Sequence, residues 1–138
     1  MTDHTTLDIS ALVNAVARLR EGLDRHRLTP QDEQLRDGLI QRFEYTYELS
    51  HRMLRRYLRT TAPSPGEYDQ MPFQDLIRIG DDQGLLRGDW PRWRRFRDMR
   101  ARTSHTYSAA VAEQVVAGIP EFLEEATHLM HQLQRRLR

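Results

Sequence analysis

The chain has 138 residues, 38% of them hydrophobic and 30% charged, which fits one compact helical domain over residues 1–138. Cysteine is absent, so disulfides, thiolate metal sites and cysteine nucleophiles are excluded. No segment approaches the roughly 18 consecutive apolar residues of a membrane span, and no signal-peptide pattern opens the chain. We therefore expect a cytoplasmic protein that does not contact the membrane.

Charge is distributed unevenly along the chain. All 21 basic residues are arginine, and they nearly balance 20 acidic residues, for a net charge of +1. Residues 51–107 carry 12 arginines and 7 acidic residues, whereas residues 1–50 and 108–138 are both mildly acidic. A basic region on an otherwise neutral protein predicts local attraction to a polyanion such as RNA.

Two helices are predicted in the first half of the chain. Residues 1–7 are expected to form a flexible N-terminus, with Asp8 as the N-cap of a helix that begins at Ile9. Apolar residues then recur at three- and four-residue steps as far as Leu23. A second and longer helix is predicted over residues 31–59, where the same spacing continues.

Shorter helices are predicted after the proline- and glycine-rich segment 61–68. One has Pro72 in its first turn and is closed by Gly80 and Gly84. Another starts at the N-cap Asp89 and continues through Arg100.

The last part of the chain is predicted to hold two further helical segments. Ser108 is a plausible N-cap for the first, over residues 109–117. Gly118 and Pro120 are expected to break or kink the chain before a final helix that extends to Leu137. Together the predicted elements favour an all-α fold, a four- to five-helix antiparallel bundle.

Arginines and aromatic residues are concentrated in residues 90–107, W-P-R-W-R-R-F-R-D-M-R-A-R-T-S-H-T-Y. Interleaved aromatic and arginine side chains can bind single-stranded nucleic acid by stacking and by phosphate contacts. The alternative is that Trp93 and Phe96 belong to the core while the arginines form a solvated helix face.

Within this segment Arg100, His105 and Tyr107 form an R-x4-H-x-Y pattern. A histidine can move protons near neutral pH, and an arginine can hold a phosphate with two hydrogen bonds. RNA cleavage by the 2′-hydroxyl needs these two roles. On a straight helix His105 would be rotated by roughly 140° from Arg100, so the helix must unwind near Thr103 and Ser104 or a second chain must complete the site.

Residues 100–107, R-A-R-T-S-H-T-Y, and 36–49, R-D-G-L-I-Q-R-F-E-Y-T-Y-E-L, resemble the HEPN superfamily. The branch is that of HepT toxins and nucleotidyltransferase substrate-binding proteins, and the resemblance covers about residues 7–137. It implies a HEPN-like bundle that pairs as a homodimer, with two such motifs meeting across the two-fold axis. It also implies a metal-independent endoribonuclease without a cofactor, in which Arg100 and His105 are catalytic.

The same resemblance implies a partner and a form of control. HepT toxins are paired with a minimal nucleotidyltransferase antitoxin, which can silence the toxin by adenylylating the motif tyrosine, here Tyr107. This chain departs from the family at Ala101, where members commonly carry asparagine. That departure favours an alternative function, a non-catalytic substrate-binding subunit of a nucleotidyltransferase pair.

Further residues are candidates for contacts with RNA or with the catalytic pair. Asp37, Gln41 and Glu44 are spaced to share one face of the second helix, where they could orient His105 or simply face solvent. The other candidates flank or lie within the motif: Arg97, Arg102, Thr103 and Ser104.

Other chemistries are disfavoured. Glu124, His128 and His131 share a helix face but lack a further strong ligand, so no metal site is predicted. Ser104 and His105 do not lie in a nucleophile-elbow pattern, which argues against a serine hydrolase. The seven glycines are scattered rather than grouped in a phosphate-binding loop, so nucleotide chemistry is assigned to the partner.

Overall fold

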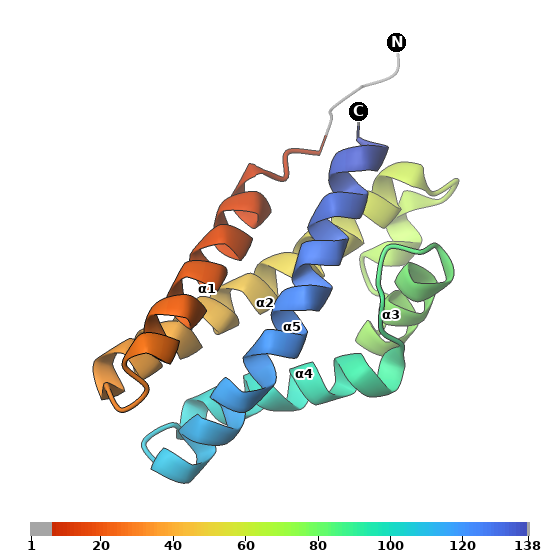
Figure 1. Cartoon of the computed structure of the whole chain (residues 1–138). Coiled ribbons are helices and arrows are strands. Elements are labelled where there is room, and N and C mark those ends of the chain that lie inside the picture. The colour runs from red at the N-terminus through yellow and green to blue at the C-terminus, as the bar shows by residue number, and fades with distance from the viewer. Residues whose placement is uncertain (1–6, 138) are drawn as a thin grey trace.

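The computed structural model describes residues 7–137, which contain five α-helices, two 3-10 helices and no β-strand (Figure 1). The α-helices are α1 (Ser10–Leu28), α2 (Glu33–Thr61), α3 (Phe73–Asp82), α4 (Trp90–Arg102) and α5 (Ala109–Arg136), and the 3-10 helices are η1 (Pro65–Tyr68) and η2 (Thr103–His105). The all-α prediction is confirmed. Of the predicted flexible segment 1–7, only Leu7 lies within the described residues, and it packs against the core. No helix in the described part is long and apolar enough to cross a membrane.

Four helices alternate in direction, and α3 is inserted between α2 and α4 (Figure 1). Arg42 of α2 donates a hydrogen bond to the carbonyl of Arg18, and Thr46 to that of Ala15 in the previous turn of α1. From the first contact to the second, the residue number increases on α2 and decreases on α1, so the two helices are antiparallel. The contacts between α4 and α5 follow the same rule: Arg95 with Glu121, and Arg102 with Gln114.

The centre of the bundle is aromatic. Phe43 of α2, Trp93 and Phe96 of α4 and Phe122 of α5 are all buried, and their rings meet edge to face. The ring centroids of Phe43 and Phe122 are 5.0 Å apart, and those of Phe96 and Phe122 are 5.3 Å apart. Such pairs stabilise a core beyond the burial of their area. The structure therefore favours the alternative in which Trp93 and Phe96 belong to the core.

Helix α5 is continuous where the sequence predicted an interruption. Gly118 and Pro120 both lie inside it. Proline removes one backbone hydrogen bond, but the buried side chains of Ile119 and Phe122 hold this turn against the core. Gly118 permits close packing of α4, because an added Cβ would lie 2.5 Å from the sulfur of Met99.

The predicted N-caps of α4 and α5 are confirmed. Asp89 accepts a hydrogen bond from the backbone N–H of Arg92, and Ser108 accepts one from that of Val111. These side chains satisfy donors that the first helical turn leaves unpaired.

Two other helix ends differ slightly from the prediction. The N-cap position of α1 is Ile9 rather than Asp8, although the Asp8 carboxylate still accepts from the N–H of Ser10 at 2.9 Å. Pro72 precedes α3 as its N-cap, and Gly80 is buried inside that helix rather than closing it. The burial of Gly80 within α3 thus outweighs the weak helix propensity of glycine.

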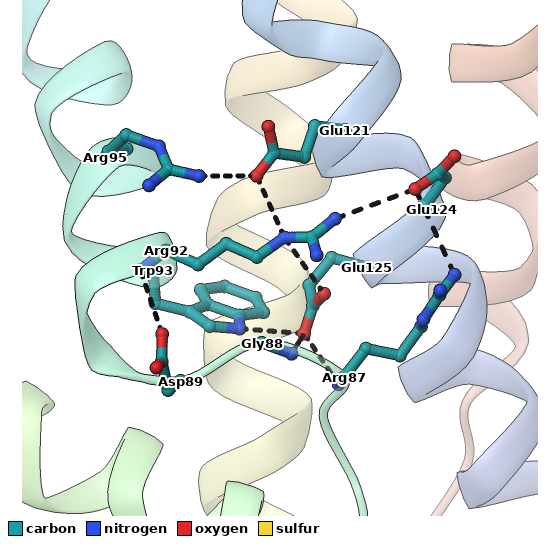
Figure 2. Close-up of polar contacts among 9 residues, drawn as sticks. All are labelled: Arg87, Gly88, Asp89, Arg92, Trp93, Arg95, Glu121, Glu124 and Glu125. Atoms are coloured by element: carbon teal, nitrogen blue, oxygen red, sulfur yellow. Dashed lines mark hydrogen bonds and ion pairs between the residues drawn. The ribbon is translucent and has the colours of Figure 1, made fainter.

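A buried carboxylate joins α4 and the loop before it to α5 (Figure 2). Glu125 has no exposed surface, and its Oε1 accepts hydrogen bonds from the backbone N–H groups of Arg87 and Gly88, both at 2.8 Å. The same oxygen accepts from the indole Nε1 of Trp93 at 3.0 Å, and Oε2 lies 3.6 Å from Nε of Arg92. A buried charge is tolerated when it is paired and hydrogen-bonded. Here Oε1 takes all three hydrogen bonds, and Oε2 is balanced by the ion pair with Arg92 alone.

Two arginines of residues 90–107 form ion pairs around this carboxylate. Arg92 lies 3.0 Å from Glu121 and 3.6 Å from Glu124, and Arg95 lies 2.6 Å from the same Glu121 oxygen (Figure 2). These pairs are partly exposed, so each contributes little to stability. They nevertheless show that two arginines of residues 90–107 neutralise acidic side chains of α5.

We predict that Glu125→Ala lowers the free energy of unfolding by about 3–5 kcal/mol, since it leaves the N–H groups of Arg87, Gly88 and Trp93 without their acceptor and removes one carboxylate beside Arg92. Urea denaturation measures the change. The matched control is Glu113→Ala, an exposed position on the same helix, which should change stability by less than about 0.5 kcal/mol. Equal stability of the two variants would show that the buried carboxylate contributes nothing.

Candidate functional site

Arg100 lies near the end of α4 and faces α2. Its Nε donates a hydrogen bond to Oε1 of Glu48 at 3.1 Å, and its Nη1 lies 3.6 Å from Oε2 of Glu44. The two carboxylates are four residues apart on α2, so they project from adjacent turns of the same face. The guanidinium is thereby held in one orientation at the α2–α4 contact.

Helix α4 ends at Arg102, two residues after Arg100. Thr103 begins η2, and its hydroxyl donates to the carbonyl of Arg100 at 2.7 Å while accepting from Nη1 of Arg100 at 3.1 Å. The hydroxyl of Ser104 donates to the carbonyl of Ala101. Hydroxyl groups that bond to nearby carbonyls favour helix ends. The predicted unwinding at Thr103 and Ser104 is confirmed.

His105 and Tyr107 stand on the exposed turn between α4 and α5. The Tyr107 side chain is 87% exposed, and the two rings meet edge to face with centroids 6.0 Å apart. Within residues 7–137 no hydrogen bond or ion pair engages the His105 imidazole, and none joins it to Arg100. The structure thus places the motif at one end of the bundle without a hydrogen bond between Arg100 and His105.

The acidic side chains around Arg100 leave one nitrogen of its guanidinium group, Nη2, available to bind a ligand. Its contacts with Glu44, Glu48 and Thr103 use Nε and Nη1 only. In the described part of the chain nothing bonds to Nη2, which carries two further donors. A phosphate oxygen can therefore meet Nη2 while the carboxylates continue to hold the side chain.

The remaining motif candidates point in different directions. The Cζ of Arg97 lies 6.0 Å from the ring centroid of Trp90, a cation–π distance. Arg102 donates to the side chain of Gln114 on α5 at 2.6 Å. Ala101 is exposed and offers no polar group. In the described residues neither the Arg97 nor the Arg102 side chain is hydrogen-bonded to Arg100, and the polar contact with Arg100 comes from Thr103 instead.

On α2 the three predicted polar residues separate. Asp37 pairs with its neighbour Arg36 at 3.2 Å, and Gln41 lines a groove between α1 and α2. Glu44 alone of the three contacts Arg100. Sequence reasoning missed Glu48, although it continues the same face four residues after Glu44.

Two ionisable residues of α2 near α4 are poor candidates for proton transfer. Burial lowers the pKa of His51, and the adjacent Arg55 guanidinium lowers it further, so the imidazole is neutral at pH 7. Burial likewise raises the pKa of Tyr47, with Glu48 adding to the rise. Both side chains belong to the aromatic packing around Phe73.

The set Glu124, His128 and His131 does not assemble as metal ligands. His128 donates to the carbonyl of Gly84 at 3.2 Å, and Glu124 lies 3.6 Å from Arg92. Within residues 7–137 no group of three or more histidine, aspartate or glutamate side chains is placed to hold a metal ion.

Comparison with known proteins gives the family. Residues 7–135 match the family described as nucleotidyltransferase substrate binding protein like. A Haemophilus influenzae protein named "Probable ribonuclease HepT" is 35% identical, and the match covers 99% of this chain and 97% of that protein.

Two solved structures share the fold. One, from Haemophilus influenzae, is described as the fold of a substrate binding domain of a nucleotidyltransferase; it is 35% identical, with a TM-score of 0.83 over 92% of this chain and 99% of the other. The second, from Thermus thermophilus, is 30% identical, with a TM-score of 0.68 over 92% of this chain and 98% of the other. The chain therefore belongs to the nucleotidyltransferase substrate binding protein like family, and its resemblance to HepT proteins is confirmed.

Proposed function

We propose that the chain is a HepT-type toxin, an endoribonuclease that cleaves RNA at Arg100 and His105 without a metal ion. The observation that carries the proposal is the arrangement of Arg100: it is oriented by Glu48 and Thr103 with Nη2 available, and His105 is exposed on the turn that follows α4. The relative named as a probable ribonuclease supports this activity, and the family supports a nucleotidyltransferase partner.

In the proposed reaction the His105 imidazole takes the proton of a ribose 2′-hydroxyl. The 2′-oxygen forms a bond to the adjacent phosphorus, and the bond from phosphorus to the 5′-oxygen breaks. The leaving 5′-oxygen takes up a proton from water, which gives a cyclic phosphate and a free 5′-hydroxyl, and the His105 imidazolium afterwards returns its proton to solvent. Arg100 stabilises the negative charge that builds up on the phosphate oxygens in the transition state.

The alternative function is a non-catalytic subunit that presents substrate to the nucleotidyltransferase. One observation favours it: both carboxylates on α2 already partly neutralise Arg100. The description of the Haemophilus structure as a substrate binding domain agrees with this alternative. Cleavage of RNA by the isolated chain distinguishes the two functions.

We predict that His105→Ala slows RNA cleavage by at least about 100-fold, because the general base is lost. Thermal unfolding should be unchanged, since the imidazole is exposed and makes no hydrogen bond in the described residues. His131→Ala, an exposed histidine on α5, is the matched control and should cleave normally. EDTA should have no effect on the wild type; an absolute requirement for metal would contradict the mechanism.

We also propose that the chain forms a homodimer. The reason is the geometry of the candidate site and not an apolar surface that needs covering. Large hydrophobic side chains exposed in the described part are few, namely Leu28, Tyr45 and Tyr107, so the bundle covers its own core. Arg100 and His105 do not contact each other within one chain, however. A second copy would supply the missing half of the site across a two-fold axis.

Light scattering at micromolar concentration should therefore give twice the 16.4 kDa mass of the chain. Mixing His105→Ala with Arg100→Ala protein offers a functional check, since mixed dimers would regain one intact pairing of the two residues. A stable monomer that cleaves RNA at the wild-type rate would refute the shared site.

Tyr107 is the proposed acceptor of AMP from the nucleotidyltransferase. Its phenol is well exposed and lies beside His105. The phenolic oxygen would form a bond to the α-phosphorus of ATP, pyrophosphate would leave, and the phenol proton would pass to solvent. The transferred phosphate would carry a negative charge that can pair with Arg100 and compete with RNA.

Co-expression with a minimal nucleotidyltransferase antitoxin should add one or more AMP masses to the wild-type chain, as measured by intact mass spectrometry. Tyr107→Phe should add none. Tyr45→Phe is the matched control, because Tyr45 is the other highly exposed tyrosine of the described chain. Unchanged modification of Tyr107→Phe would place the acceptor elsewhere.

A further inference from the structure

A groove lies between α1 and α2, beside the candidate site but separate from it. It encloses about 700 Å³. Small residues contribute to its lining, namely Ala11 and Ala15 on α1 and Gly38 on α2. The two helices lie side by side (Figure 1). The groove runs between them and is lined by residues of both.

Four polar side chains line this groove without being used by the fold. Asn14 and Arg18 come from α1, and Gln41 and Tyr45 come from α2. Among residues 7–137 no hydrogen bond or ion pair engages any of these side chains. Their neighbour Arg42, in contrast, bonds to the carbonyl of Arg18 and lies 3.6 Å from Glu21.

Gly38 indicates that the opening is not a by-product of packing. Glycine inside a helix is unfavourable relative to alanine. A Cβ added at Gly38 would meet no atom within 4 Å, whereas one at Gly118 would lie 2.5 Å from Met99. Close packing therefore requires glycine at position 118 but not at position 38, where the absent side chain leaves the groove open.

We propose that this groove binds a nucleobase of single-stranded RNA. Tyr45 is 59% exposed and offers a ring face for stacking, the carboxamides of Asn14 and Gln41 can bond to the edge of the base, and Arg18 can pair with a phosphate. The lining includes no acidic side chain that would repel a phosphate.

The position of the groove relates it to the candidate site. Gln41 and Tyr45 lie three residues before Glu44 and Glu48, the two carboxylates that hold Arg100. Residues three apart on a helix are neighbours on its surface. A nucleotide in the groove would thus belong to the same strand as the phosphate at Arg100, and the groove would select the base near the cleaved bond. This assignment rests on the proposed function.

The test fills the groove without disturbing the fold. Gly38→Leu places a side chain in the opening, and Gly38→Ala is the matched control that leaves room for a base. Both should unfold at or above the wild-type temperature, because neither meets an atom of the protein at its Cβ. The probe is a single-stranded hexaribonucleotide with 2′-O-methyl groups, which cannot be cleaved by the 2′-hydroxyl route.

Fluorescence anisotropy should show that Gly38→Leu and Tyr45→Ala bind the probe roughly 10-fold or more weakly, the loss expected for one stacked base. Gly38→Ala and Tyr45→Phe should bind within about twofold of wild type, because both keep the stacking surface. Wild-type affinity in Gly38→Leu, or an equal loss in Gly38→Ala, would overturn the proposal. A change from dimer to monomer in Gly38→Leu would also overturn it, by showing that the groove is an interface between copies.

Two outcomes distinguish this proposal from the proposed function. If the wild type cleaves unmodified RNA and Gly38→Leu binds and cleaves equally well, the groove assignment fails while the nuclease stands. If the wild type never cleaves RNA yet binds the probe, and Gly38→Leu loses that binding, the nuclease fails while the groove stands.

Discussion

The buried carboxylate of Glu125 is the contact that fixes the position of α4. It accepts hydrogen bonds from the backbone of the α3–α4 loop and from the Trp93 indole, so one side chain of α5 sets both where α4 begins and how it is rotated. An uncompensated charge in this place would be costly, which makes the arrangement specific as well as stabilising. Ion pairs from Arg92 and Arg95 to Glu121 extend the same attachment along the surface.

The rotation of α4 decides what its arginines can do. With Trp93 and Phe96 turned into the aromatic core, Arg92 and Arg95 face α5, whereas Arg100 faces α2. Within this run of arginines, Arg92 and Arg95 therefore serve the attachment to α5, whereas Arg100 lies at the candidate site. The unwinding after Arg102 then exposes His105 and Tyr107 on a turn, where bulky ligands or a partner protein can reach them.

Helix α2 connects the candidate site with the α1–α2 groove. Its inward face supplies core residues such as Phe43, while Glu44 and Glu48 on one flank orient Arg100. Gln41 and Tyr45, which are their neighbours on the helix surface, line the groove. The carboxylates reduce the net charge available to a phosphate but hold the guanidinium in place through charge-assisted contacts.

The sequence by itself determined the features that depend on neighbouring residues: the helical stripes, the N-caps Asp89 and Ser108, and the unwinding at Thr103, because periodicity, capping and hydroxyl-to-carbonyl bonds are local. Only the tertiary structure decided the contacts between distant residues. Arg100 and Glu48 are 52 positions apart, Trp93 and Glu125 are 32 apart, and nothing in the spacing of either pair predicts their contact. The continuity of α5 through Pro120 is of the same kind, since packing against α2 and α4 supplies the stability that the missing backbone hydrogen bond removes.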